Sequence, residues 1–498
     1  MFEAAVQGLV SIMHWKAFAL MLVGITISST LVAMPGVGSK TAIALLLPFA
    51  FVLDKAEAVA LIVSIWAVSN TANSITAILF SVPGGGGSQA TIMDGYPMAQ
   101  KGEGARALSA AFTSSALGGI FGAIVLLAAI PVLRPLVLLL GPPEFFMLVM
   151  MGVAMVGSLS GKSPLKGIAI GVLGLSLSMI GIHDLTAMPR YTFDIIYLYD
   201  GIGLVPLTIG LFAIPELVYL ASKGSSISSV PLGDLRAGRL QGVKDAFKNW
   251  WLVIRSSFVG VWVGIIPGLG SSVADWFAYG HALQTCRNAR ETFGKGDVRG
   301  VIAVDSATNA KEGGSLIPTL AFGIPGSSTL ALIFGGLLIV GIKPGKEILT
   351  TQLDVTFSII WLLIIASVIT SVICLLFTRQ LAMATMLRPT VLVPVILAMA
   401  AMGSFANSNR FEDVIVMVVF GVIGYFLRLS GWPRPPLLLG LVLGPLAERF
   451  MWTSYQVFGW GFLLRPGVII LFLLLLATVS YPLWQQYQAN KTKAEIGG

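Results

Sequence analysis

The sequence predicts an all-α polytopic membrane protein with two inverted-topology repeats, broken helices and re-entrant hairpins. Hydrophobic residues make up 56% of the 498 residues and charged residues 11%, whereas a soluble domain carries about 25% charged residues. Long apolar runs recur along the chain. In addition, a Pro-Gly phrase occurs twice inside apolar sequence, as Pro35-Gly36-Val37-Gly38 and as Pro267-Gly268-Leu269-Gly270. Breaks in corresponding positions of two halves are typical of transporters with internal repeats.

The apolar runs are long enough to cross a bilayer as helices. They lie at residues 17–34, 107–130, 168–182, 359–377, 391–402, 414–427 and 468–479. A crossing takes about 20 residues, so the chain has room for roughly ten to twelve membrane segments. Backbone polar groups in lipid must be bonded within the segment, which excludes open strands. We expect the first run to be a retained helix, because Glu3 precedes any basic residue and no clear cleavage site follows.

The excess of positive charge, +8 overall, lies in loops between the apolar segments. The most basic loop runs from Lys223 to Arg255, and we expect it in the cytoplasm, where Lys and Arg are enriched. Membrane topology explains this charge without a nucleic-acid partner. The loop also divides the chain into a first half with scaffold helices (1–222), a basic cytoplasmic linker (223–255) and a second half with C-terminal helices (256–498).

A second basic loop, from Arg287 to Arg299, follows the second Pro-Gly phrase closely. If both loops are cytoplasmic, residues 256–281 enter and leave on one side, although two full crossings need about 40 residues. A re-entrant hairpin that turns at Pro267-Gly268 fits the available length. Irregular backbone at this depth is tolerated where protein buries it or where it lines a watery cavity.

Each half continues with a cluster of neutral polar residues and then a further Pro-Gly phrase. Residues 69–76 precede Pro83-Gly84 in the first half, and residues 306–309 precede Gly313-Gly314-Ser315 and Pro325-Gly326 in the second. Helix N-termini attract anions, whereas freed carbonyls suit a cation, so such a site can hold a carboxylate and a coupling ion together. The alternative role for these Ser, Thr and Gly residues is close helix packing.

Charged residues near the clusters are candidates for function, because intramembrane ionisable groups are costly. Asp275 could serve an ion or proton site or be exposed in a loop, and Lys40 and Asp305 are further candidates. Lys311-Glu312 is interpreted as an internal pair or as residues at the aqueous mouth. The residues expected at the coupling ion or in the hairpin backbone are Pro35, Gly36, Gly38, Ser39, Pro267, Gly268, Gly270, Ser271 and Asp275.

The sequence lacks a convincing enzyme pattern. Residues 36–41 place a serine between the glycine and the lysine, so they do not form a phosphate loop. His14, His183 and His281 stand alone, without the spacing of a zinc site or a hydrolase base. We therefore predict no catalytic residue, no cofactor and no metal beyond a transported cation, Na⁺ or H⁺. Without a nucleotide motif, active transport must use an ion gradient.

These motifs resemble the large membrane subunit of the tripartite tricarboxylate transporters. The resemblance rests on Pro35-Gly36-Val37-Gly38, on the string Asp94-Gly95-Tyr96-Pro97-Met98-Ala99 and on Gly323-Ile324-Pro325-Gly326, and it spans almost the entire chain. It implies a secondary transporter of the bacterial inner membrane that imports organic anions, chiefly tri- and dicarboxylates, driven by Na⁺ or H⁺. The mechanism that we predict is alternating access, with a site between the two inverted halves. The implied partners are a small four-helix membrane subunit, a periplasmic substrate-binding protein and membrane lipid, and a homodimer is compatible with it. The alternatives are a stand-alone carboxylate symporter and a channel-like uniporter.

The resemblance also implies which residues bind the substrate. They are Asn70, Thr71, Asn73, Ser74, Thr76, Pro83, Gly84, Thr308, Asn309, Gly313, Gly314, Ser315, Pro325 and Gly326. The sequence departs from the family pattern near Asp305 and Thr308, where Pro-Glu and a double Asn are common. This departure affects the identity of the substrate more than the class of transport.

Overall fold

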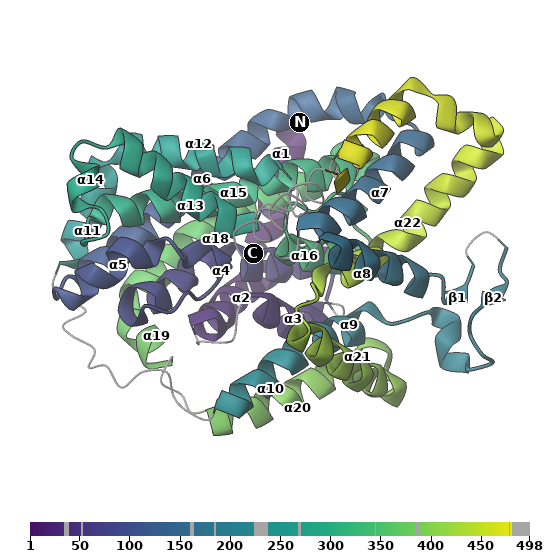
Figure 1. Ribbon diagram of the computed structural model, residues 1–498, viewed down its shortest axis with the longest axis horizontal. Coiled ribbons are helices and arrows are strands. Elements are labelled where there is room, and N and C mark those ends of the chain that lie inside the picture. The colour runs from purple at the N-terminus through teal and green to yellow at the C-terminus, as the bar shows by residue number, and fades with distance from the viewer. Residues whose placement is uncertain are drawn as a thin grey trace, which may run out of the picture.

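The chain is almost entirely helical in the computed structural model (Figure 1), as the sequence predicts. The structure describes residues 1–33, 39–50, 53–159, 164–183, 186–223, 238–266, 270–343, 345–384, 389–477 and 479–480. One departure from an all-α fold is a short antiparallel ribbon, in which β1 (Gly181–Ile182) pairs with β2 (Pro189–Arg190).

Among the residues that the structure describes, four helices have the length and apolar composition to cross a membrane. They are α2 (Trp15–Ala33), α4 (Lys55–Phe80), α6 (Gly104–Leu138) and α18 (Leu353–Leu376). A bent pair, Pro435–Leu464 and Pro466–Ala477, meets at 68° and would form a fifth span. The chain is thus a multi-pass helical membrane protein, and the larger number of segments stays a prediction.

Shorter helices complete the architecture. In the first half they are α1 (Phe2–Met13), α3 (Ser39–Ala50), η1 (Gly86–Ser88), α5 (Thr91–Gln100), α7 (Pro142–Leu159), α8 (Pro164–Leu177), η2 (Ile196–Asp200), α9 (Leu204–Thr208), η3 (Ile209–Ala213) and α10 (Ile214–Lys223). The second half adds α11 (Arg239–Lys248), α12 (Trp250–Ile265), α13 (Gly270–Thr285), α14 (Ala289–Thr292), α15 (Val298–Phe322), α16 (Ser328–Ile339), α17 (Lys346–Thr350), α19 (Thr378–Ala384), α20 (Pro389–Ser408), α21 (Phe411–Leu429), α22 (Pro435–Phe458) and η4 (Gly459–Leu464).

Helix α15 lies at the centre of one lobe of the molecule, where α4, α5, α6, α12 and α13 all contact it (Figure 1). Two of these helices, α6 and α12, each approach α15 closely through a pair of glycines one turn apart. Gly118 and Gly122 place the backbone of α6 against α15, and Gly260 and Gly264 do the same for α12. Glycine pairs at this spacing permit close helix approach in membranes.

Helices α4 and α15 end in the same way. The residue after α4 is Ser81, with φ of 56°, and the residue after α15 is Gly323, with φ of 70°; both are left-handed. A proline follows two residues later in each case, at Pro83 and Pro325. A left-handed residue ends a helix and a following proline cannot continue it, so the repeated phrases have the same local structure.

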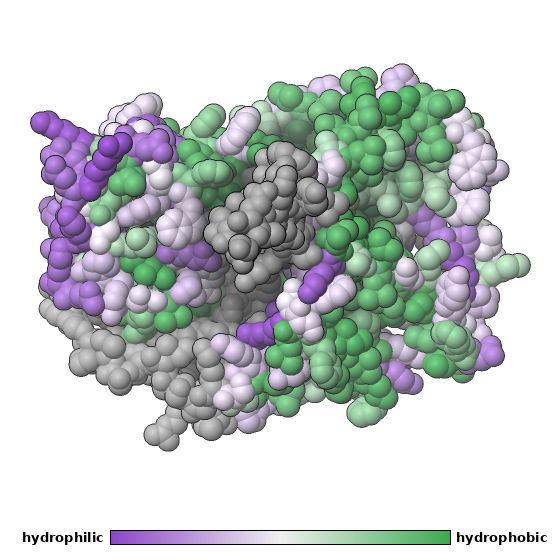
Figure 2. Space-filling model, in the orientation of Figure 1, coloured by the Kyte–Doolittle hydropathy of each residue, from purple (hydrophilic) through white to green (hydrophobic). Residues whose placement is uncertain are grey.

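The surface separates into hydrophilic and hydrophobic regions. Hydrophilic residues gather at the end of the molecule where α5, α11 and α14 lie, and hydrophobic residues cover the part formed by α7 and α22 (Figure 2). On α12, the side chains of Trp250, Trp251 and Trp262 are more than half exposed. Aromatic side chains of this kind are enriched where a protein meets lipid.

The predicted linker is partly helical. Residues 224–237 lie outside the described residues, and α11 packs against α6 through an ion pair in which Arg106 Nε lies 2.6 Å from Asp245 Oδ2. Helix α12 begins at Trp250, inside the predicted linker. It contacts α13, so the two helices that flank Pro267-Gly268 lie side by side, whereas the turn itself is not among the described residues.

Candidate functional site

The neutral polar cluster of the first half lies on α4 and that of the second half on α15, and the two clusters meet. Asn70 donates its Nδ2 hydrogens to the carbonyl oxygen of Thr308 at 3.1 Å and to Glu312 Oε1 at 2.7 Å. Ser74 donates to Asp305 Oδ1. Because these residues are all buried, the contacts place polar groups of both halves inside the protein.

Residues from two further segments, η1 with the start of α5 and the first half of α13, complete this arrangement. We call it the polar seam, and its members are Asn70, Ser74, Gln89, Ala90, Thr91, Ser271, Asp275, Asp305, Thr308, Lys311, Glu312 and Ser315. They lie on α4, on the segment from η1 to the start of α5, on α13 and on α15. The seam unites residues from both halves of the sequence.

Two buried carboxylates lie at one end of the polar seam. Asp275 Oδ2 accepts the backbone N–H groups of Gln89 at 2.8 Å and Ala90 at 3.1 Å, while its Oδ1 is buried without a hydrogen-bond partner. Asp305 Oδ2 accepts the hydroxyl of Thr91 at 3.2 Å. Asp275 is therefore a buried residue of helix α13 and is not exposed in a loop. Oxygen ligands of this type suit a small cation or a proton.

An ion pair lies at the other end. Lys311 Nζ is 3.0 Å from Glu312 Oε2 and 3.4 Å from Ser271 Oγ. The exposed fraction is 1% for Lys311 and 4% for Glu312. Of the two interpretations from the sequence, the structure has the internal pair.

A second set of polar contacts joins α4 and α15 to α6. Asn309 donates to Thr71 Oγ1 at 3.0 Å and to the carbonyl of Ser115 at 3.0 Å. The Thr71 and Ser115 hydroxyls are 2.8 Å apart. Asn309 and Thr71, both predicted as substrate ligands, thus satisfy each other in this structure.

The glycines after α4 lie directly on Asn73. A Cβ atom at Gly84 would be 2.8 Å from Asn73 Oδ1 and 2.7 Å from Thr76 Oγ1. A Cβ there would also lie 2.9 Å from Asn73 Cα, so a larger residue at Gly84 would require α4 or this segment to shift. The buried Oδ1 of Asn73 has no hydrogen-bond partner, so Asn73 retains an open acceptor beside Pro83-Gly84.

The corresponding residues after α15 have mixed environments. Gly313 contacts Gly122 of α6, and Gly314 contacts Val261 of α12, so both lie in helix contacts. Gly326 packs on Ser315, and its N–H donates to Thr319 Oγ1 at 3.3 Å. A role of Gly313, Gly314 and Pro325-Gly326 in substrate binding stays a prediction.

The first Pro-Gly phrases are only partly described. Pro35, Gly36, Gly38, Pro267 and Gly268 lie outside the described residues. Ser39 is the first residue of α3, and Gly270, with φ of 68°, begins α13.

Some residues of the site do not stand out in the sequence as ligands. Thr91 and Ser115 reach the clusters from α5 and α6, and Asp94 anchors α5. Asp94 Oδ1 accepts the N–H groups of Gly296 and Asp297 at 2.9 and 2.8 Å, and Oδ2 accepts the Tyr279 hydroxyl at 3.0 Å. Burial raises the pKa of the Asp94 carboxyl above its ordinary value, although these hydrogen bonds oppose the shift. The unusual Asp-Gly-Tyr-Pro string was the available indication of this role.

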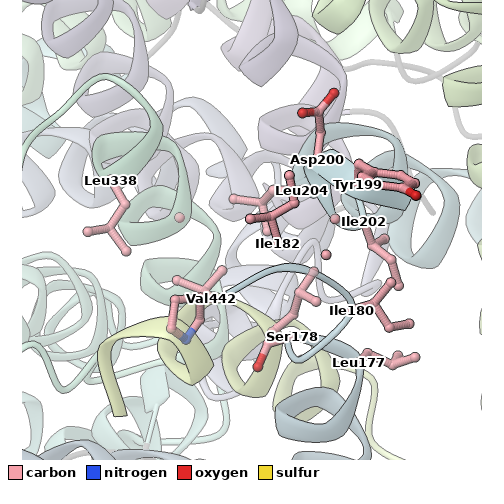
Figure 3. A pocket seen from close by; sticks show the side chains of 15 residues that line it. Leu177, Ser178, Ile180, Ile182, Tyr199, Asp200, Ile202, Leu204, Leu338 and Val442 are labelled. Atoms are coloured by element: carbon pink, nitrogen blue, oxygen red, sulfur yellow. The ribbon is translucent and has the colours of Figure 1, made fainter. Parts of the chain in front are cut away.

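Two pockets lie apart from the buried charges of the seam. One of about 350 Å³ is lined by residues of α8, β1, η2, α16 and α22, and Figure 3 shows Asp200 and Tyr199 near Ile202 and Leu204 there. The other, about 570 Å³, is apolar and is bordered by Pro318 and Ile324 near the end of α15. Neither pocket includes a member of the polar seam.

Comparison with known proteins agrees with this architecture. The model of the tripartite tricarboxylate transporter TctA family matches residues 18–439, which include both polar clusters. The chain belongs to this family. Membership identifies a membrane component of a transport system, and the name of the TctA family refers to a tripartite assembly.

Two curated relatives of this family member are uncharacterized proteins of Agrobacterium vitis. The protein in the TAR-I ttuC' 3' region is 32% identical over 431 residues, which cover 86% of this chain and 85% of the relative. The protein in the TAR-II ttuC' 3' region is 33% identical over 192 residues, which cover 39% of this chain and 79% of the relative. No solved structure matches the chain.

Proposed function

We propose that this protein is the large subunit of an ion-coupled, binding-protein-dependent importer of organic carboxylates in the bacterial inner membrane. The observation that carries the proposal is the polar seam, which places buried charges from α13 and α15 against hydrogen-bond donors from α4. Ionisable groups inside a membrane protein are expensive and mark substrate and ion pathways. Family membership supports a transport role.

The charges of the polar seam favour coupled transport. Asp275, Asp305 and Glu312 are carboxylates, against the single ammonium of Lys311, and all four are buried. An anionic substrate would add negative charge to a buried site that already contains more carboxylates than ammonium groups. Cation binding near Asp275 and Asp305 would offset that cost, so that substrate and cation each favour binding of the other.

The contact between the two halves supports an inverted repeat with alternating access. Asn70 and Glu312 are 242 residues apart in the sequence, the same separation as Pro83 and Pro325. Corresponding positions of two repeats touch each other where a two-fold axis passes between them. A site on such an axis can be exposed to one side and then to the other when the halves rock against each other.

Reconstitution tests this proposal. Proteoliposomes containing the protein and its copurifying small subunit are given labelled citrate, succinate, malate and fumarate. Uptake is measured with and without the cognate binding protein and with an imposed Na⁺ or proton gradient. We expect accumulation that requires both the binding protein and one gradient. Flux that only equilibrates would favour a uniporter, and accumulation without the binding protein would favour a stand-alone symporter.

A further inference from the structure

Lys311 is the most unusual charged residue of the polar seam. Among the lysines and arginines whose side chains the structure describes, it alone is in the buried class, with 1% of its surface exposed. Desolvation of an ammonium group costs several kcal/mol unless a close partner compensates for it. A long, strongly hydrated side chain in this position therefore calls for a specific role or a strong structural partner.

The surroundings of Lys311 favour an anion. Its Nζ approaches Ser271, which lies in the first turn of α13, where a helix carries partial positive charge. Gly87 of the segment after α4 is also close, because a Cβ there would be 2.9 Å from Ser271 Cβ. Lys311 thus lies beside Ser271, where η1, which follows α4, meets the start of α13. The ammonium group of Lys311 and the N-terminus of α13 both attract anions.

In this structure the Glu312 carboxylate pairs with Lys311, in the place where an anion would bind, and it also has a second hydrogen-bond donor. Its Oε1 accepts a hydrogen bond from Asn70 at 2.7 Å, whereas the Ser315 hydroxyl, 3.4 Å from Oε2, lies closer to the Glu312 carbonyl oxygen, at 2.9 Å. The hydrogen bond from Asn70 would remain if Lys311 moved to another carboxylate. The exchange leaves Glu312 hydrogen-bonded, with a negative charge that a coupling cation or proton can neutralise.

We propose that Lys311 binds a carboxylate of the transported substrate and that Glu312 takes the place of this carboxylate in the empty site. The inference rests on the proposed function and deepens it, because it names one residue that determines specificity for ionised carboxylates. Substrate entry breaks the Lys311–Glu312 ion pair and forms a Lys311–substrate ion pair, so the number of charge pairs is conserved. The pair thereby links anion binding to the release of a negative side chain.

The test compares K311M, E312Q and the double variant K311M/E312Q with the unaltered protein in the same three-component proteoliposomes. K346M serves as the control, because Lys346 is exposed and far from the seam in sequence. Each variant is assayed with the best carboxylate of the panel and with its monoamide. The ratio of their uptake efficiencies is compared between variants, so that the contribution of the binding protein cancels.

We expect K311M to raise the apparent KM for the carboxylate at least about tenfold and to lower the carboxylate-to-monoamide ratio by a similar factor, as loss of a charged hydrogen bond does. E312Q keeps the ratio, because it removes only the internal competitor. K311M/E312Q recovers the thermal stability that either single variant loses, but its ratio stays low.

A double variant with normal stability and a normal carboxylate-to-monoamide ratio would overturn the inference and leave a purely structural ion pair. In that outcome uptake itself persists, so the proposed transport function stands. If the unaltered protein takes up no member of the panel under any gradient, the proposed function fails, and the inference fails with it.

Discussion

Helices α4 and α15 are both buried and end in the same way, but they differ in where their charged residues lie. Both are buried along most of their length, and both end in a left-handed residue that precedes a Pro-Gly break. The charges of α4, Lys55 and Glu57, lie in its first turn, whereas α15 carries Asp305 and Lys311-Glu312 near its middle. The two helices thus end in the same way, but of the two it is α15 that carries charges near its middle.

This difference shows how buried charge is supported in the protein. Asn70 and Ser74 of α4 are neutral donors, and they bond the carboxylates of Glu312 and Asp305 on α15. Unpaired charges in a low-dielectric interior are costly. Any movement that separates α4 from α15 therefore requires new partners for these carboxylates, and a cation or proton can supply them.

The largest effect is expected from removal of charge on α15. D305N should abolish gradient-driven accumulation, because an amide cannot offer the negative oxygen that attracts a cation or the site that accepts a proton. Uptake at equal substrate concentrations with and without an imposed gradient measures this effect. The control is D354N, on α18, where Asp354 is not buried. Full ion-driven accumulation by D305N would remove Asp305 from the coupling site.

A smaller effect is expected from loss of a neutral donor on α4. N70A should raise the apparent KM at least about tenfold, because it removes two hydrogen bonds from groups that stay buried, at about 1–3 kcal/mol for each unsatisfied group. Initial rates over a range of carboxylate concentrations give the value. The control is N309A, because Asn309 donates to Thr71 and Ser115 and not to Glu312. An equal change of KM in N70A and N309A would contradict a special role for the Asn70–Glu312 contact.

The packing that holds α15 in place gives a separate prediction. A Cβ at Gly260 would clash with the carbonyl oxygen of Ala307, so G260A should destabilise the protein by about 1–3 kcal/mol, as overpacking does. Thermal unfolding in detergent measures the change. G280A is the matched control, because no neighbouring atom lies within 4 Å of a Cβ there. Equal stability of the two variants would contradict close contact between α12 and α15.

The smallest effect is expected from S74A. Asp305 keeps the hydroxyl of Thr91 when Ser74 is removed, so one hydrogen bond of a charged group is lost, at about 1.5–3 kcal/mol, partly offset by rearrangement. Because the Ser74 hydroxyl stabilises the ionised carboxylate, we expect S74A to raise the affinity for the coupling proton or cation severalfold in uptake assays at varied Na⁺ or pH. A complete loss of coupling in S74A would indicate that the hydroxyl itself binds the cation.

The sequence predicted the helical membrane fold and the residue clusters of the site, because composition and Pro-Gly breaks are local features. It did not mark α15 as a membrane-length helix, since its internal charges interrupt the apolar pattern. Asp275 and Asp305 stood out as charges near the clusters for the same reason. The sequence did not predict which residues contact Asp275 and Asp305, because these contacts depend on how α4, α5, α13 and α15 pack.

The remaining contacts are long-range and leave no local pattern. Thr91 reaches Asp305 across more than two hundred positions of sequence, and Ser115 meets Asn309 from the middle of α6. Small polar residues such as these are common in membrane helices as packing residues. Only the arrangement of α4, α6 and α15 distinguishes them from the others.

The most direct test of the polar seam is substrate protection of Ser271. In a C286S/C374S background, the S271C variant is treated with a small maleimide in proteoliposomes, with and without the best carboxylate and its coupling ion. T285C, at the exposed end of the same helix, is the control. We predict that the carboxylate slows labelling of S271C at least about tenfold and leaves T285C unchanged. Equal labelling rates with and without a saturating transported carboxylate would contradict a substrate site in the polar seam.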